Sequence, residues 1–269
     1  MEETLIRLAR AIDQKRYGKY RGFVTNNVDP EKRGRIKLLI PSVMEDQETD
    51  WALPCLPFGG LAEQGFVTIP EIDAQVWVEF EEGDPQRPIW SGTFWQDDVN
   101  VPTEAAKDEP TTRLLKTPSG HMLQFDDEDS KEKIHIHHKS NSNITFDEKG
   151  SLAITDSSEA IVSLDAENNE IIIKDANGNT LKMTSSGINM EDANGNKLEM
   201  GASGITLEAQ NIILKGSVKL GGEAGEAVIK ADTFLNAYAA HTHPTSAGPS
   251  GPPVMTAEMS SKAVKVVST

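Results

Sequence analysis

The chain has 269 residues, a formal net charge of -16 at pH 7, and only 37% hydrophobic and 6% aromatic residues. This negative charge repels phosphate backbones, so we expect no nucleic-acid partner. The low apolar content excludes one large compact core and favours a slim or repetitive architecture.

Residues 1–16 are the first segment in chain order. Leu5, Leu8 and Ile12 recur at helical spacing between charged residues, which predicts a short amphipathic helix. A helix of this length is unstable alone, so we expect it to dock on another surface. The segment lacks the apolar stretch of a signal peptide, and we expect synthesis in the cytoplasm without one.

Residues 17–98 are expected to form a small closed β-barrel. The alternating segments RGFVTNNV and GRIKLLIP flank the turn DPEKRG, in which Pro30 fixes φ and Gly34 permits positive φ. Residues 51–57 are interrupted by proline, which suits a connection or a sheet edge. Three further segments, FVTIP, AQVWVEF and PIWSGTFW, have strand character and complete a set of about five strands.

A linker and a repetitive region follow. Residues 99–112 carry proline, acids and threonine without periodicity and are predicted to be a linker. From residue 113 the sequence consists of short strands broken by turns. The stretches DANGNTLKMTSSGINM, from Asp175, and DANGNKLEMGASGITL, from Asp192, repeat at an offset of 17 residues. Asn-Gly is a strong hairpin signal, and a short period indicates a stacked β structure.

The strands of this region carry little apolar material. Each offers one or two apolar residues on a face, as Ile171 and Ile173 or Leu181 and Met183 do. One chain cannot close a core from so few side chains, whereas three chains around a common axis would each supply a third of the interior. We therefore predict a homotrimer.

The first half of the chain resembles a known family. YGKYRGFVTNNVDPEKRGRIKLLIPSV and its continuation WALPCLPFGG…GFVTIPEIDAQVWVEFEEGDPQRPIWSG resemble the oligonucleotide/oligosaccharide-binding (OB) type barrel of phage baseplate assembly protein V and VgrG tip proteins. The most specific marks are Asp29-Pro30 with Gly34-Arg35, and Val76-Trp77-Val78 with Gly83-Asp84-Pro85.

The next segment, TPSGHMLQFDDEDSKEKIHIHH, is similar to the neck of the VgrG spike. In that spike the barrel passes into an intertwined trimeric β-helix. The resemblance implies an all-β fold with an N-terminal OB-like barrel over residues 17–98. An intertwined trimeric β-helix stalk would then span residues 113–240, and an apex with a C-terminal tail would span residues 241–269.

His241 and His243 are the candidate metal ligands. Residues i and i+2 of an extended chain point the same way, so three chains would place six imidazole nitrogens around one axis. Six nitrogens suit an octahedral ion such as Fe²⁺. The HTHP motif is similar to the apex of short phage spikes, which implies one iron ion per trimer. A blunt apex that receives a separate PAAR-like cap protein is the competing prediction.

The remaining histidine cluster favours a structural interpretation. Ile134 and Ile136 alternate with His135 and His137, and His138 follows directly. The alternation places the two isoleucines inside and His135 and His137 on the solvent side.

Other candidate sites also favour structural interpretations. Asp175, Asn177 and Asn179 imitate the start of a calcium-binding loop, but the glycine and glutamate that such a loop needs are absent, which predicts a simple turn. Residues 126–129 are interpreted as a solvated acidic loop. Cys55 is the only cysteine, so no disulfide forms within the chain, and it has no nearby histidine to make it a nucleophile.

The resemblance implies a structural spike that is not an enzyme. Such a spike would seat its barrel on the tube, hub and baseplate proteins of a contractile, phage-tail-like injection machine and puncture the target-cell envelope mechanically. The alternative is a carbohydrate-binding or carbohydrate-cleaving β-helix tailspike. After residue 112 the aromatic residues are Phe125, Phe146, Phe234 and Tyr238, which supplies a sugar platform poorly.

Overall fold

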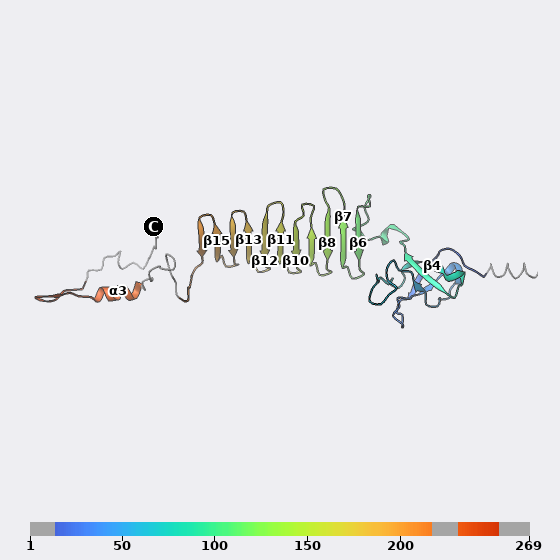
Figure 1. Ribbon diagram of the computed structural model, residues 1–269, viewed down its shortest axis with the longest axis horizontal. Coiled ribbons are helices and arrows are strands. Elements are labelled where there is room, and N and C mark those ends of the chain that lie inside the picture. Colours follow the sequence, from blue (N-terminus) through green and yellow to red (C-terminus); the bar gives the residue numbers. More distant parts are fainter. Residues whose placement is uncertain (1–13, 217–230, 253–269) are drawn as a thin grey trace, which may run out of the picture. The chain divides into compact units, whose positions relative to one another are not determined.

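The computed structural model of the protein describes residues 14–216 and 231–252 (Figure 1). The helix predicted over residues 1–16 lies outside the described residues as far as residue 13, and residues 14–16 are not helical. The chain divides into two compact units, one mainly over residues 1–158 and one mainly over residues 168–269. In the described part of the chain, no helix is long and apolar enough to cross a membrane.

The barrel segment contains short strands and helical turns. Its elements are β1 (Tyr20–Asn26), β2 (Lys37–Leu39), α2 (Pro41–Met44), β3 (Leu53–Pro54), β4 (Gln75–Phe80), η1 (Glu81–Gly83), β5 (Pro88–Thr93) and η2 (Asp98–Asn100). The strands form one sheet in the order β2-β1-β4-β5-β3. An antiparallel bridge between Ile36 and Ala52 joins the two ends of this order, because each residue directly precedes an edge strand. The bridge closes the sheet into a five-stranded barrel.

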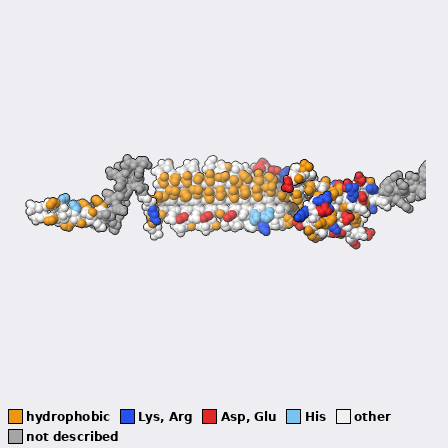
Figure 2. All heavy atoms as spheres, turned by 60° about the horizontal axis from the view of Figure 1, so that its bottom comes forward, with side chains coloured by type: hydrophobic (Ala, Val, Ile, Leu, Met, Phe, Trp, Pro, Cys, Tyr) orange, Lys and Arg blue, Asp and Glu red, His pale blue; other side chains and the backbone are white. Residues whose placement is uncertain are grey.

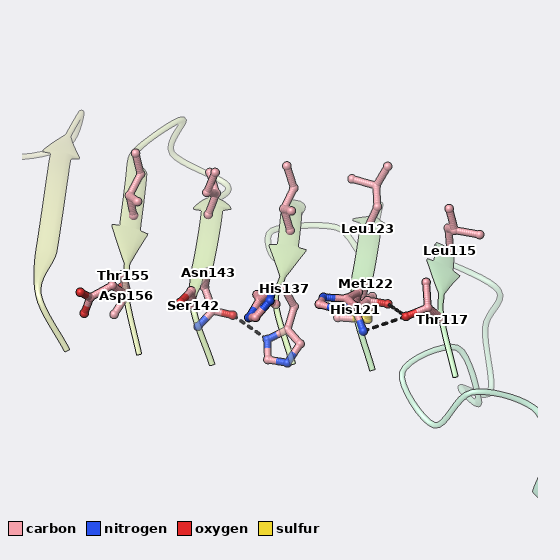
Figure 3. Close-up of a pocket in the computed structure, with 14 residues that line it drawn as sticks. Leu115, Thr117, His121, Met122, Leu123, His137, Ser142, Asn143, Thr155 and Asp156 are labelled. Atoms are coloured by element: carbon pink, nitrogen blue, oxygen red, sulfur yellow. Dashed lines mark hydrogen bonds between the residues drawn. The ribbon is translucent and has the colours of Figure 1, made fainter. Parts of the chain in front are cut away.

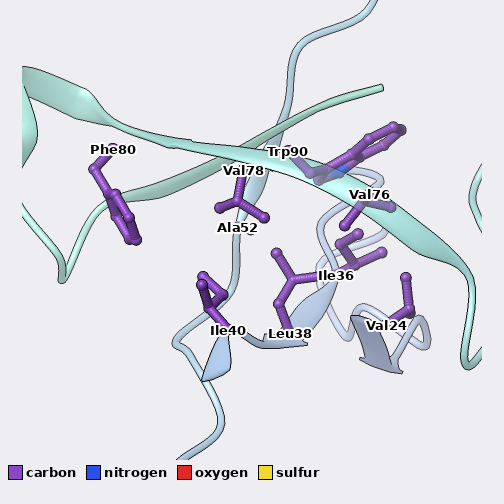
Figure 4. Packing of buried hydrophobic residues seen from close by; sticks show 9 residues of the cluster. All are labelled: Val24, Ile36, Leu38, Ile40, Ala52, Val76, Val78, Phe80 and Trp90. Carbon is purple, nitrogen blue, oxygen red and sulfur yellow. The ribbon is translucent and has the colours of Figure 1, made fainter. Parts of the chain in front are cut away.

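The interior of the barrel is filled by nine apolar side chains from different strands (Figure 4). They are Val24, Ile36, Leu38, Ile40, Ala52, Val76, Val78, Phe80 and Trp90. In β4 the residues alternate between buried and half-buried, so every second side chain enters the core. This period of two is the pattern that the sequence AQVWVEF predicts for a half-buried strand.

One predicted barrel strand is wrong. FVTIP, residues 66–70, is a loop, because Phe66 donates its backbone N–H to the carbonyl of Phe58 across a turn with positive φ at Gly59 and Gly60. The fifth strand is instead β3, which pairs in parallel with β5 at the sheet edge. Residues 51–57 therefore contain the last strand of the sheet order, and the Ile36–Ala52 bridge pairs the edge that the proline residues predicted.

The chain beyond the barrel forms a second sheet of eleven strands. They are β6 (Thr112–Lys116), β7 (Met122–Asp126), β8 (Lys133–His137), β9 (Asn143–Phe146), β10 (Leu152–Thr155), β11 (Ile161–Asp165), β12 (Glu170–Lys174), β13 (Thr180–Thr184), β14 (Gly187–Glu191), β15 (Lys197–Gly201) and β16 (Gly204–Glu208). Their order in the sheet is their order in the sequence, so each strand pairs with the strands before and after it. We call this sheet the ladder.

The ladder does not extend as far as predicted. The β stalk was expected to reach residue 240, but α3 occupies Ala231–Ala240, and the last ladder strand ends at Glu208. Alanine-rich sequence favours a helix there over a strand. A short hairpin of β17 (Pro244–Thr245) and β18 (Gly248–Pro249) follows the helix.

Candidate functional site

One face of the ladder is apolar along its length (Figure 2). In β6 to β10 the strand register aligns two rows of side chains on this face. The first row is Leu115, Leu123, Ile136, Ile144 and Ile154, and the second is Phe125, Ile134, Phe146 and Leu152. We call this side of the sheet the apolar face.

The same two rows exist in the later strands. There they are Ile173, Leu181, Met190, Leu198 and Leu207, and Ile171, Met183, Ile188, Met200 and Ile205. The 17-residue repeat explains their alignment, because each repeat contains two strands and two turns and returns an apolar residue to the same row. Within each row, directly opposite side chains of neighbouring strands contact each other and stabilise the sheet.

The apolar face is exposed in the single chain. Ile134 is 39% and Ile136 44% accessible, whereas the intervening His135 and His137 are half-buried. The predicted sidedness of these four residues is confirmed, but the prediction that the isoleucines lie inside is wrong for one chain. A continuous apolar surface of this extent marks an interaction site rather than ordinary surface.

The opposite face of the ladder is polar and well hydrogen-bonded. Nε2 of His135 and Nδ1 of His137 lie 3.0 and 2.8 Å from Oδ1 of Asn143, whose amide group donates to the carbonyl of Asn141. Because that amide identifies Oδ1 as the acceptor, both imidazoles donate to it. This pair therefore has a structural role, and the described residues contain no group of three or more residues suited to hold a metal.

Part of the acidic segment 126–129 is not solvated as predicted. Asp126 is buried, and its carboxylate binds Nζ of Lys107 at 2.8 Å. The Lys107 ammonium lowers the pKa of Asp126, and the carboxylate raises the pKa of Lys107. Lys107 also contacts Glu128 at 3.2 Å. The predicted linker is thus attached to the first hairpin, which no sequence pattern indicated.

A second histidine pair lies on the other side of the sheet and was missed. His121 and His138 are opposite each other at the ends of β7 and β8, with ring centroids 4.5 Å apart. They continue the alternation of Leu123 and Ile136 and so border the apolar face. Both histidines and all five residues of the first apolar row help to line an open hollow of about 550 Å³. Figure 3 shows His121 beside Thr117 at this edge.

The turn interpretation of Asp175, Asn177 and Asn179 is confirmed. One carboxylate oxygen of Asp175 accepts the backbone N–H groups of Asn177 and Asn179, both at 2.9 Å. The other accepts their side-chain amides at 3.2 and 2.6 Å. These donors lower the pKa of Asp175 to about 2. A carboxylate saturated in this way serves the turn rather than a cation.

The candidate metal ligands follow α3 directly. His241 and His243 are exposed, and their ring centroids are 5.1 Å apart with an interplanar angle of 82°. Nδ1 of His241 lies 2.7 Å from the carbonyl of Tyr238, which accepts only, so this nitrogen carries the proton. The Nε2 lone pair of His241 is then available to a metal, an arrangement common in metal-binding histidines. One chain supplies two such imidazoles, so a complete ligand set needs further copies.

The barrel turn that carries the family resemblance is held by an ion pair. Asp29 is only 4% exposed, and its carboxylate binds the guanidinium of Arg35 through Nε and Nη2, the latter at 2.7 Å. It also accepts the backbone N–H groups of Glu31 and Arg33 at 3.0 and 2.8 Å. Arg35 holds the pKa of Asp29 well below its usual range. Trp90 closes the turn by donating its indole N–H to the carbonyl of Gly34 at 3.2 Å.

Comparisons with known proteins agree with this barrel. Residues 20–95 match the type VI secretion system/phage-baseplate injector OB domain. The chain is 30% identical over 116 residues to the actin cross-linking toxin VgrG1 of Vibrio cholerae, covering 40% of this chain and 10% of that protein. It is also 30% identical over 113 residues to the type VI secretion system spike protein VgrG5 of Pseudomonas aeruginosa, covering 39% of this chain and 14% of that protein.

A solved structure of the CPAP G-box domain matches 71% of this chain and 99% of its own length, with a TM-score of 0.29 and 13% identity. A likeness this weak does not indicate a shared fold. The matched region spans 10% of the length of VgrG1 and 14% of the length of VgrG5. The barrel of residues 20–95 thus matches an injector OB domain, and part of the chain is similar to VgrG proteins.

Proposed function

We propose that this chain is the structural spike of a contractile, phage-tail-like injection machine and acts mechanically rather than as an enzyme. The observation that carries the proposal is the combination of an injector OB domain with a ladder whose apolar face runs along eleven strands. The barrel would seat on the tube, hub and baseplate proteins. The ladder would form the stalk that enters the target-cell envelope.

The exposed apolar face supports assembly as a homotrimer. Leucine, isoleucine and methionine side chains such as Ile136, Met190 and Leu207 remain 44%, 46% and 52% accessible in one chain. Three copies related by a threefold axis along the ladder would turn these faces inward and remove them from water. Each strand offers only two apolar residues to the interior, which suits a narrow stalk.

The backbone supports the mechanical role. Every neighbouring pair of ladder strands is joined by hydrogen bonds that run along the direction in which the strands are stacked. A stalk built in this way resists bending and compression, because deformation strains many hydrogen bonds together. In this proposal contraction of a sheath supplies the force, and the chain makes no covalent step.

The proposed apex is formed by His241 and His243. Three copies would supply six imidazole nitrogens, a set that suits one octahedral ion such as iron. The tautomer of His241, fixed by the carbonyl of Tyr238, supports this assignment. The competing proposal is that a PAAR-like cap protein covers the apex and that these histidines contact the cap.

The tailspike alternative has less support. Phe125 and Phe146, the aromatic residues within the ladder strands, both lie in the apolar row, where they would be covered on assembly. An outward-facing platform for sugars is therefore not formed by these strands. We expect the chain to be made in the cytoplasm and assembled into the baseplate of a particle.

The proposal is tested by complementation. In a strain whose contractile particles lack this chain, the wild-type chain should restore particles that damage target cells, and the polar-face variant Thr145→Asp should do the same. The apolar-face variant Ile144→Asp should not enter the particles. Purified, active particles that never contain the wild-type chain would refute the spike role.

A further inference from the structure

The two ends of the β7–β8 hairpin carry opposite chemistry on the apolar side of the sheet (Figure 2). At one end lie His121 and His138, followed by Lys139, and residues 116–121 and 137–143 contain no acid. At the other end lie Asp127 and Glu132, inside the acidic turn DDEDSKEK. Both pairs border the same apolar rows, because the alternation that includes Leu123 and Phe125 reaches His121 in one direction and Asp127 in the other.

The geometry of the ladder makes this asymmetry relevant to assembly. Strands run across the direction in which they stack, so the two ends of one strand lie at the same height along the ladder. A rotation about an axis parallel to the stacking direction keeps every residue at its height. It therefore brings the histidine end of one copy beside the acidic end of the next copy.

We propose that the His121–His138 end of each chain packs against the Asp127–Glu132 end of a neighbouring copy, forming a repeated head-to-tail corner contact. The inference rests on the proposed homotrimer and adds which strand ends of neighbouring copies meet. Head-to-tail contacts of this kind use two different patches and close into a ring under cyclic symmetry.

The hydrogen bonding of the histidine end suits a carboxylate partner. Nδ1 of His138 accepts the backbone N–H of Ser140 at 3.2 Å, so the neutral ring carries its proton on Nε2. That N–H, together with the Lys139 ammonium, provides donors for an acidic turn. On the other edge, Asp127 already binds Arg113 of its own chain at 2.5 Å, which leaves Glu132 as the main acceptor in the proposal.

Cysteine pairs test the contact directly. In the full chain with Cys55→Ser, the pair Glu132→Cys and His138→Cys occupies the two ends of β8, six residues apart. This is about 20 Å in an extended strand, too far for a disulfide within one chain. Oxidation, or a bismaleimide shorter than this separation, should therefore yield covalent dimers and trimers on denaturing gels.

The matched control is the pair Lys133→Cys and His137→Cys, at the ends of the same strand but on the polar face. It should give no covalent trimers. The native mass of each uncrosslinked variant tests the homotrimer separately from the corner contact. A trimer in which only the control pair crosslinks would overturn the corner contact and leave the spike proposal standing, whereas a folded monomer would overturn both.

A charge exchange gives a second, independent readout. His138→Glu adds a third acid to each corner, beside Asp127 and Glu132 of the neighbouring copy. It should lower the temperature at which the assembly dissociates by about 2–4 °C. Adding Glu132→Lys should restore most of this loss. If the dissociation temperature of the double variant were no higher than that of His138→Glu alone, the pairing of Glu132 with His138 would be contradicted.

Discussion

Ala193 donates its backbone N–H to Oδ1 of Asn179 at 3.1 Å, which attaches one Asp-Ala-Asn-Gly-Asn turn of the ladder to the next. The two turns lie on the same edge because the 17-residue repeat contains two strands. Within each turn the aspartate accepts the same set of donors. The repeat is thus stabilised along its edge as well as between its strands.

Asn179 and Asn196 form a matched pair for this contact. Both donate to the aspartate of their own turn, at 2.6 and 2.7 Å, but among the described residues Asn179 alone also accepts from the following turn. We expect Asn179→Ala to destabilise the protein more than Asn196→Ala, by about 0.5–1.5 kcal/mol, the usual net value of one hydrogen bond. Chemical denaturation of the assembled protein measures the difference. Equal losses would show that the turn-to-turn bond adds nothing.

Gly187 and Gly204 occupy equivalent places 17 residues apart. Both have positive φ, +145° and +131°, so alanine at either position costs about 1–3 kcal/mol in backbone strain. A Cβ at Gly187 would also lie 1.9 Å from the carbonyl oxygen of Met200, whereas nothing lies within 4 Å of one at Gly204. Gly187→Ala should therefore lower the melting temperature well beyond Gly204→Ala. The reverse order would contradict the strand register.

The pH dependence of the barrel should report on Asp29. Arg35 depresses the pKa of Asp29 in the folded state, so the stabilisation is present above the unfolded pKa of about 3.9. It is lost as the pH falls through the lower folded value. We expect the stability of the wild type to decline below about pH 4 and that of Asp29→Asn to be lower at neutral pH with a weaker decline. Parallel profiles for both proteins would rule out this role.

Removing the apex histidines should remove the metal without dissociating the chains. We expect elemental analysis of the purified wild type to find one ion per three chains, and of His241→Ala with His243→Ala to find none. The control variant His135→Ala with His137→Ala should keep the ion, because the imidazoles that it removes bind Asn143 in the wild type. A wild-type metal content well below one per three chains, in protein prepared without chelators, would favour the cap-protein proposal.

Local pattern predicted the parts of the fold in which neighbouring residues determine the structure. The period of two in AQVWVEF, the Asp29–Arg35 turn and the Asn-Gly turns all hold in the structure. The strand predicted for FVTIP is wrong because this segment has no neighbouring strand to pair with. Its backbone forms loop hydrogen bonds instead of strand pairs. Strand character depends on a partner that a short segment does not reveal.

The candidate site was predictable only in part. The sequence indicated that His135 and His137 lie on the side opposite to Ile134 and Ile136, but exposure of the isoleucines depends on whether other chains are present. The Lys107–Asp126 ion pair joins residues 19 positions apart, and Lys107 lies in a segment without periodicity. The His121–His138 pair depends on the register of β7 and β8, which only the paired strands determine.

Substitutions on the two faces of β9 should separate assembly from folding of the strand. Ile144→Asp places a charge in the first apolar row, and burying it without a partner is strongly unfavourable, so we expect the trimer to be lost. Thr145→Asp changes the adjacent residue on the polar face and should leave the trimer intact. Sedimentation velocity of both variants checks this. Loss of assembly in both would indicate a general defect of β9.

The native mass of the full wild-type chain at micromolar concentration shows whether the apolar face assembles three copies. We expect the mass of three chains, because one chain leaves its entire apolar face in water. We also expect this assembly to resist dissociation on dilution. A folded chain that sediments as a monomer, with the ladder intact by circular dichroism, would contradict the proposal that the apolar face assembles three copies into a spike.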